Sequence, residues 1–136
     1  MTIGDGHSGL GKTRHHWDPD VHRVVQRVFN RFSSVSCNTY DCHPFCGPPG
    51  DRGAWQRRSI DIWGPAGRGD PLDPHLSELA LDFLIELPGK PLIRHWILDH
   101  TLWVRGVGYL PWPANDHTGL LRHVHVTYLP VPPLST

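Results

Sequence analysis

Two histidines stand two residues apart near the C-terminal end of the chain, in the segment RHVHVTY. On a β-strand, residues i and i+2 point to the same face, so His123 and His125 would share one face while Val124 and Val126 enter the core. Histidine is the commonest metal ligand among side chains. The pattern therefore predicts a metal-binding or catalytic pair. The alternative is chance, because the chain contains 11 histidines.

Two further residues are suited to complete a metal site. A catalytic zinc typically takes three protein ligands and leaves a fourth position for water. Asp61 stands between two isoleucines in RRSIDIWG, where an unpaired charge would be costly. His43 lies in a Pro/Gly-rich loop and is followed by a proline. Asp70, in the segment GRGDP, is a weaker rival to Asp61 and is typical of a turn residue.

With these residues in order, the chain resembles the zinc peptidases of the lysostaphin/D-Ala-D-Ala peptidase/hedgehog superfamily, in particular their VanY-like cell-wall branch. The shared order is His…Ser-x-Asp…His-x-His, and the similarity extends over roughly residues 18–130. The resemblance implies zinc ligands at His43, Asp61 and His125. It also implies an α+β fold and hydrolysis of peptide stems or crosslinks in peptidoglycan. Such a protein would act in the cell wall or elsewhere outside the cytoplasm.

Two departures from the family pattern affect the catalytic residues. The compact His-x-x-Gly-x-Ala-x-Asp motif of VanY-like enzymes is absent, because 17 residues separate His43 from Asp61. The acidic residue that those enzymes place three positions before the last ligand is Arg122 here. The resemblance then leaves His123, as in the lysostaphin branch, or Asp116 as the group that accepts a proton.

Other side chains are suited to contact a substrate. Arg122 or Arg58 would hold a substrate carboxylate through two parallel hydrogen bonds. The aromatic candidates for lining a cleft are Trp63, Trp103 and Trp112. Two other functions stay open: a metal-containing domain that binds cell-wall peptides without cutting them, and a small structural domain whose histidines are incidental.

The three cysteines at positions 37, 42 and 46 are too few for a disulfide framework and odd in number. One bridge, Cys42–Cys46 or Cys37–Cys46, would stiffen the loop that carries His43 and would suit an oxidising compartment. A structural zinc knot of the three cysteines and one histidine is the rival interpretation. Its spacings fit no standard zinc ribbon.

The segment GHSGLGKT matches the phosphate-loop pattern letter for letter. That loop needs a buried strand before it and a helix after it, so that backbone N–H groups surround the phosphates. Only five residues precede Gly6, and the following RHHWDPD has no helical stripe. We therefore expect a flexible Gly-rich arm over residues 1–16 and no nucleotide site.

Composition excludes several classes of partner. Lys+Arg and Asp+Glu number 13 each, so nothing favours nucleic acid or an anionic membrane. No apolar run approaches the roughly 18 residues of a membrane span, and the N-terminus lacks the apolar region of a secretory signal. The length of 136 residues suits one domain, which we place at 17–136 and expect to be monomeric.

The elements that must position these residues follow from periodicity. Asp-Pro pairs predict the starts of two helices, over 18–32 and 73–87. The apolar stripe of the second helix should comprise Leu76, Leu79, Ala80, Phe83 and Leu84. Alternation predicts strands at 34–40, 57–64 and 122–130, and a hairpin over 92–106 that turns near Asp99. This order predicts an α+β fold, a small antiparallel sheet with two main helices packed on one face.

Overall fold

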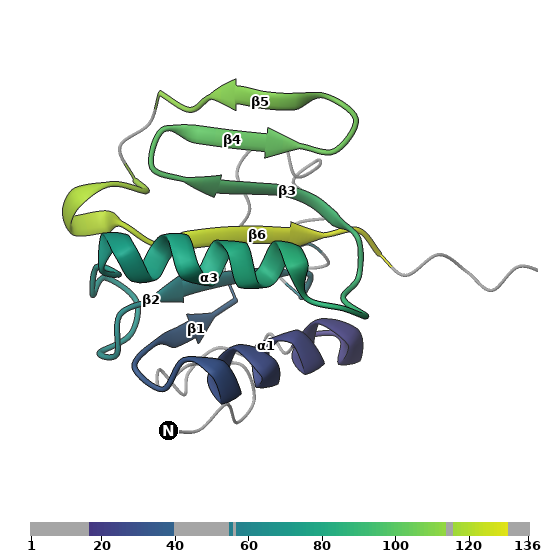
Figure 1. The fold of residues 1–136 in the computed structure, drawn as a ribbon, viewed down its shortest axis with the longest axis horizontal. Coiled ribbons are helices and arrows are strands. Elements are labelled where there is room, and N and C mark those ends of the chain that lie inside the picture. Colours follow the sequence, from purple (N-terminus) through teal and green to yellow (C-terminus); the bar gives the residue numbers. More distant parts are fainter. Residues whose placement is uncertain (1–16, 40–54, 56, 114–115, 131–136) are drawn as a thin grey trace, which may run out of the picture.

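The computed structural model describes residues 17–39, 55, 57–113 and 116–130. The elements are α1 (Pro19–Arg31), β1 (Ser36–Asn38), β2 (Ser59–Trp63), α3 (Pro74–Glu86), β3 (Ile93–Leu98), β4 (Thr101–Val104), β5 (Gly108–Pro111), the 3₁₀ turn η3 (Gly119–Leu121) and β6 (Val124–Tyr128). The two α-helices lie on one side of a six-stranded antiparallel sheet, with α3 running in front of β6 (Figure 1). The α+β class is therefore confirmed. The predicted arm over 1–16 lies outside the described residues.

The sheet has the strand order β1-β2-β6-β3-β4-β5. The last strand in the chain, β6, thus lies at the centre, between β2 and β3. The hairpin predicted over 92–106 is present as β3 and β4, and Asp99 in its turn adopts a positive φ of 54°. The edge strand β5, four residues paired with β4, was not predicted from periodicity. No helix in the described part of the chain is long and apolar enough to cross a membrane.

Helix α1 begins where the Asp-Pro pair predicts, but Asp18 does not use its side chain as a cap. Its carboxylate instead accepts hydrogen bonds from Arg57 and Arg58, which lead into β2. Trp17, just before the helix, donates its indole N–H to the backbone oxygen of Ser59 at 2.7 Å. The start of α1 is therefore tied directly to the strand that carries Asp61.

Helix α3 is capped as predicted, with the Asp73 carboxylate accepting the backbone N–H of Leu76 at 3.0 Å. The predicted apolar stripe is partly wrong, because Leu79 is exposed whereas Ser77 and Leu81 are buried. Ser77 tolerates burial because its hydroxyl donates to the backbone oxygen of Asp73 at 2.8 Å. Apolar residues lie on nearly every side of this helix, so periodicity alone does not fix its buried face.

The helix-covered face of the sheet forms the core. Ile60 pairs with Val126 and Ile62 pairs with Val124, and all four side chains are completely buried. Both valines of HVHV therefore enter the core, as predicted. The helices contribute the side chains of Val21, Val24, Val25, Val28, Ala80, Leu81 and Leu84. The residues between these strand positions must consequently point to the opposite face.

Candidate functional site

Asp61 and His125 lie directly opposite each other on the two neighbouring strands β2 and β6. Alternation turns both side chains away from the helices, and neither is exposed to solvent. The Nδ1 atom of His125 lies 2.7 Å from Oδ1 of Asp61, a charge-assisted hydrogen-bond distance. The structure thus brings together two of the three predicted metal ligands, which are 64 residues apart in the chain.

The second ring nitrogen of His125 also has a partner on this face. Its Nε2 atom lies 3.0 Å from the hydroxyl of Thr127, which lies 2.8 Å from the hydroxyl of Ser59. Ser59 in turn donates to the backbone oxygen of Trp55 at 2.8 Å. His125 is therefore held from both sides, by Asp61 and by a chain of hydroxyl groups.

His123 lies on the other side of the same carboxylate. Because a carbonyl oxygen only accepts, the Nδ1–H of His123 donates to Leu121, at 2.7 Å. Its Nε2 atom lies 3.8 Å from Oδ2 of Asp61. Trp63 stacks on the ring, with centroids 4.0 Å apart and planes inclined by 13°. His123 and His125 therefore share one face of β6, as predicted, with Asp61 between their nitrogens, and a metal-binding or catalytic role for the pair stays a prediction.

His117 is a member of this cluster that the sequence did not predict. It lies before η3 and is completely buried, with its ring centroid 4.2 Å from that of His123 and 6.2 Å from that of His125. Asp116 places Oδ1 3.6 Å from its Nε2. The only sequence signal was the histidine six residues before HVH, in a segment without regular periodicity.

His95 is the second missed histidine, and a β-bulge places it. Ile93 pairs with Tyr128 whereas His95 pairs with Thr127, so the register shifts by one residue between them. The shift lets Ile93 join the core while His95 points to the polar face. Its ring centroid lies 5.4 Å from that of His125. Strict alternation along β3 would have put Ile93 and His95 on the same face of the sheet.

Burial and neighbouring charges shift the pKa of three groups in the cluster, Asp61, His117 and His123. Burial works against ionisation of Asp61, but the charges of His125 and His123 and the hydrogen bond from His125 hold the pKa of this carboxyl below its ordinary value. Burial lowers the pKa of His123, although Asp61 opposes the shift. Burial, with the neighbouring His123 and His125, lowers the pKa of His117 to about 3.

Of the other predicted residues, Asp116 lies at the rim of the cluster and Arg122 is turned towards the β3–β4 turn. The Asp116 side chain is 43% exposed and accepts the indole N–H of Trp112 at 3.2 Å. The Arg122 guanidinium pairs with Asp99 at 3.0 Å. Arg58 is buried at the start of β2 and bonds to Asp20. These ion pairs direct both arginines to partners other than Asp61, so a substrate-binding role for them stays a prediction.

The three tryptophans predicted to line a cleft are divided between the two faces. Trp63 stacks on His123, and Trp112 meets His117 edge-on with centroids 6.3 Å apart. Trp103 instead packs against the core cluster. The aromatic side chains that could line a site are therefore Trp63 and Trp112.

Of the three cysteines and His43, only Cys37 lies among the described residues. His43, Cys42 and Cys46 lie outside the described residues. Cys37 is a free thiol on the core face, paired with Ile62, and burial raises its pKa. A Cys37–Cys46 bridge therefore does not agree with the structure, whereas the zinc knot stays a prediction because its other cysteines lie outside the described residues. The Asp70 carboxylate accepts the N–H of Ala66 at 2.9 Å, as a turn residue would.

The carboxylate of Asp61 and the neighbouring imidazoles are of the types that bind metal ions, although their atoms are not arranged around a common ion position. No group of three or more His, Cys, Asp or Glu among the residues placed in the structure is arranged to hold an ion. Nδ1 of His125 and Oδ1 of Asp61 lie 2.7 Å apart, whereas two donors on one tetrahedral zinc lie about 3.3 Å apart. Oδ2 of Asp61 is buried without a hydrogen-bond partner in the described chain. A cation would satisfy this oxygen.

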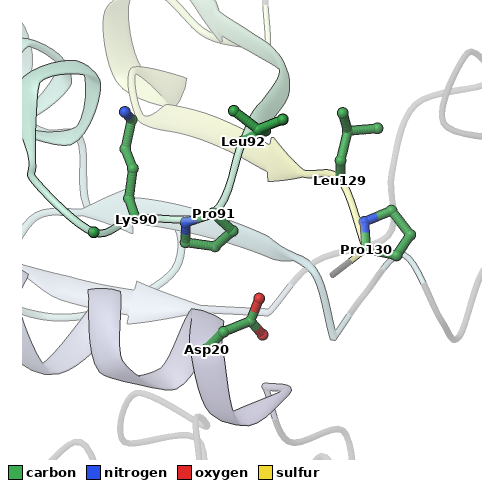
Figure 2. Close-up of a pocket in the computed structure, with 7 residues that line it drawn as sticks. Asp20, Lys90, Pro91, Leu92, Leu129 and Pro130 are labelled. Atoms are coloured by element: carbon green, nitrogen blue, oxygen red, sulfur yellow. The ribbon is translucent and has the colours of Figure 1, made fainter. Parts of the chain in front are cut away.

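A pocket of about 310 Å³ is separate from the histidine cluster. Figure 2 shows its walls: Asp20 of α1, residues 89–92 that link α3 to β3, and residues 129–130 after β6. Asp20 accepts a hydrogen bond from Arg58 at 2.5 Å. The side chain of Lys90 points away from Asp20 (Figure 2). The pocket contains none of the residues around Asp61, so the two features are independent.

No family model matches the chain, and no curated protein and no solved structure matches it. Function is therefore argued from the arrangement of the side chains.

Proposed function

We propose that this protein is a zinc-dependent peptidase that hydrolyses peptide stems or crosslinks of peptidoglycan, outside the cytoplasm. The observation that carries the proposal is the contact between Asp61 and His125, buried in the central strands with His123 on the other side of the carboxylate. Carboxylate and imidazole groups are typical zinc ligands. A buried charge of this kind is costly unless it is paired or binds a metal.

Asp61 and His125 bind the zinc in this proposal, and His43 supplies the third protein ligand. When bound, zinc polarises the scissile carbonyl group and lowers the pKa of a water molecule. The backbone pairing of β2 with β6 holds Asp61 and His125 opposite each other before any cation arrives. Two of the ligands therefore stand on rigid elements, which favours a precise site.

His123 accepts the proton that the attacking water loses. Its Nδ1–H is committed to the Leu121 carbonyl, so the lone pair of the neutral ring is on Nε2, the nitrogen nearer Asp61. Stacking against Trp63 keeps the ring in this orientation. Asp116, at the rim beside His117, is the alternative proton acceptor. Arg122 holds the segment before His123 through its pair with Asp99.

A second function, a metal-containing domain that binds cell-wall peptides without cutting them, is favoured by one observation. The side chains of Asp61, His117 and His125 are completely buried, and His123 is only 4% exposed. A hydrolytic zinc site must admit a water molecule and a peptide bond. Burial of this kind is equally compatible with a structural cation and with a catalytic cation.

The test compares the parent protein with His125→Gln and with His75→Gln, a control at an exposed position of α3. Zinc content is measured after reconstitution and dialysis, and purified peptidoglycan is then incubated with each protein and analysed for new peptide ends. We expect about one zinc per chain and peptide release for the parent and the control, and neither for His125→Gln. Zinc without peptide release would favour the second function. A parent that takes up no zinc would overturn both.

A further inference from the structure

A groove of about 460 Å³ lies between α3 and the hairpin of β3 and β4. Trp96 and Leu98, which line it, belong to the core cluster, so the groove lies on the helix side of the sheet, opposite to the face of Asp61. Its volume falls within the roughly 300–1,000 Å³ of ligand sites. Its helix side is formed by Glu78, Leu81 and Asp82, and its strand side also includes Asp99 and Thr101. The groove is therefore separate from the proposed zinc site and does not depend on it.

An aromatic row leads out of this groove. Trp96 lies opposite Trp103 of β4, which lies opposite Tyr109 of β5, so the three side chains share one face. The rings of Trp96 and Tyr109 meet edge-on, with centroids 6.0 Å apart, and Tyr109 is 72% exposed. No helix in the described part of the chain lies in front of β4 and β5 (Figure 1). Apolar surface is therefore available beside the groove.

The helix side of the groove carries negative charge that the described residues do not neutralise. Glu78 and Asp82 are exposed and one helical turn apart, and neither forms an ion pair with a described residue. Helix α3 contains no Lys or Arg. Asp99, the third acid of the groove, pairs with Arg122 at 3.0 Å. Like charges four residues apart on a helix repel, so a cation bound between Glu78 and Asp82 would be stabilising.

We propose that the groove binds an extended peptide segment with arginines at alternate positions. Glu78 and Asp82 are separated by about 6 Å along the helix axis, and alternate side chains of an extended peptide lie about 6.6 Å apart on one side. Two arginines with one residue between them therefore reach both carboxylates. Their aliphatic stems pack on the apolar side of the groove, which includes Trp96, while the guanidinium groups stay at the rim. Arg105 already places its guanidinium 5.5 Å from the centroid of the Trp103 ring, an arrangement that an aromatic surface favours.

The probe is the peptide acetyl-Arg-Ala-Arg-amide, and the same peptide with citrulline in place of both arginines is its neutral control of nearly the same shape. Nitrogen-15 NMR of the labelled protein follows the indole N–H of Trp96 and the backbone N–H of Thr101 during the titration and gives the dissociation constant. The protein variants are Glu78→Gln, Asp82→Asn and their combination. Glu86→Gln, one turn after Asp82 and outside the groove, is the matched control. All three acidic side chains are exposed, so the variants keep the fold.

We expect the arginine peptide to shift the Trp96 and Thr101 signals of the parent, and the citrulline peptide to bind more weakly. Glu78→Gln and Asp82→Asn should each raise the dissociation constant by about 2–5-fold, the effect of losing one exposed ion pair, and the double variant should raise it by about 5–25-fold. Glu86→Gln should change it by less than about 1.5-fold.

Three results would overturn the proposal. Equal binding of the citrulline peptide would show that the acidic side of the groove does not select the ligand. An equally large effect of Glu86→Gln, or no shift at Trp96 with millimolar peptide, would show that the groove is not the binding site. Self-association of the parent in sedimentation, abolished in the double variant, would assign the groove to a second copy, whose α1 presents the exposed side chains of Arg23, Arg27 and Arg31. None of these measurements involves zinc, so the proposed function is tested independently.

Discussion

Replacing Asp61 by Asn changes the charge at the centre of the sheet and almost nothing else. The side chain is completely buried, and its Oδ1 receives His125 Nδ1 at 2.7 Å. Asn has nearly the same shape and keeps one oxygen that can accept this N–H. The substitution therefore removes the negative charge while the hydrogen bond persists in a weaker, neutral form.

The magnitude follows from what Asp61 contacts. A hydrogen bond to a charged group contributes about 1.5–3 kcal/mol and a neutral one about 0.5–1.5 kcal/mol, so zinc-free Asp61→Asn should lose about 1–2 kcal/mol of unfolding free energy. The loss stays below the roughly 3–5 kcal/mol of a broken buried ion pair because Asn keeps an oxygen that accepts the His125 N–H. Zinc binding should weaken by more than about 100-fold, since changes beside a ligand already cost about 10–100-fold.

Urea unfolding in the presence of a chelator measures the first quantity, and chelator competition measures the second. Asp99→Asn is the matched control, because it makes the same chemical change in the turn between β3 and β4, at a side chain that is 48% exposed. Its backbone φ of 54° suits Asn as well as Asp. The loss of its exposed pair with Arg122 should cost less than about 1 kcal/mol, with zinc affinity unchanged.

Two results would refute this reasoning. Unchanged zinc affinity in Asp61→Asn would remove Asp61 from the ligand set, and with it the observation on which the proposed function depends. A rise in the stability of the zinc-free variant would show that the neighbouring histidines do not compensate the buried carboxylate. The direction given for the Asp61 pKa would then be wrong.

Three further predictions concern other buried groups. Because the pKa of His117 is lowered from 6.5 to about 3, the unfolded chain takes up a proton first as the pH falls. The stability of the zinc-free protein should therefore drop by about 1.5–2 kcal/mol from this group between pH 6.5 and 5, and urea titrations of His117→Phe should lack that part of the drop. Burial raises the pKa of Cys37, so iodoacetamide at pH 8 should modify this thiol only after unfolding, as peptide mapping would show; modification in the native protein would contradict its placement. Arg58→Met leaves Asp20 without its buried partner and should cost about 3–5 kcal/mol in thermal or urea unfolding. A further Asp20→Asn change should recover part of that cost, and an Arg58→Met cost below about 1 kcal/mol would count against the pair.

The parts of the fold that the sequence predicts are those fixed by local patterns. Alternation around Asp61 and His125 determined which side chains face the core, because a strand has only two faces. Asp-Pro pairs located the starts of both helices, since proline fits the first helical turn and lacks only an N–H that would be unpaired there. The buried face of α3 was less predictable because apolar residues surround that helix.

The parts that the sequence did not predict depend on contacts between distant segments. His95 reaches the polar face only because of the bulge opposite β6, and periodicity within β3 contains no sign of it. His117 lies in a non-repetitive segment and is placed by packing against His123. The edge strand β5 has four residues, including a glycine and a proline, and it forms because β4 offers a free edge. Each case required knowledge of the partner strand or ring.

The stability of the fold alone does not explain why Asp61 and the neighbouring histidines are buried together. Replacing a buried ion pair by well-packed apolar side chains is often neutral or stabilising, so the core does not need Asp61 and its histidines for strength. His123 and His125 nevertheless flank one carboxylate at the centre of the sheet, and His117 and His95 lie next to these two rings, where isoleucine or valine would pack at less cost. Perturbed titratable groups of this kind gather at functional sites more often than elsewhere. The cost of burying these groups is explained if they bind a cation, and a cation bound between Asp61 and His125 would lie on two paired strands inside the sheet.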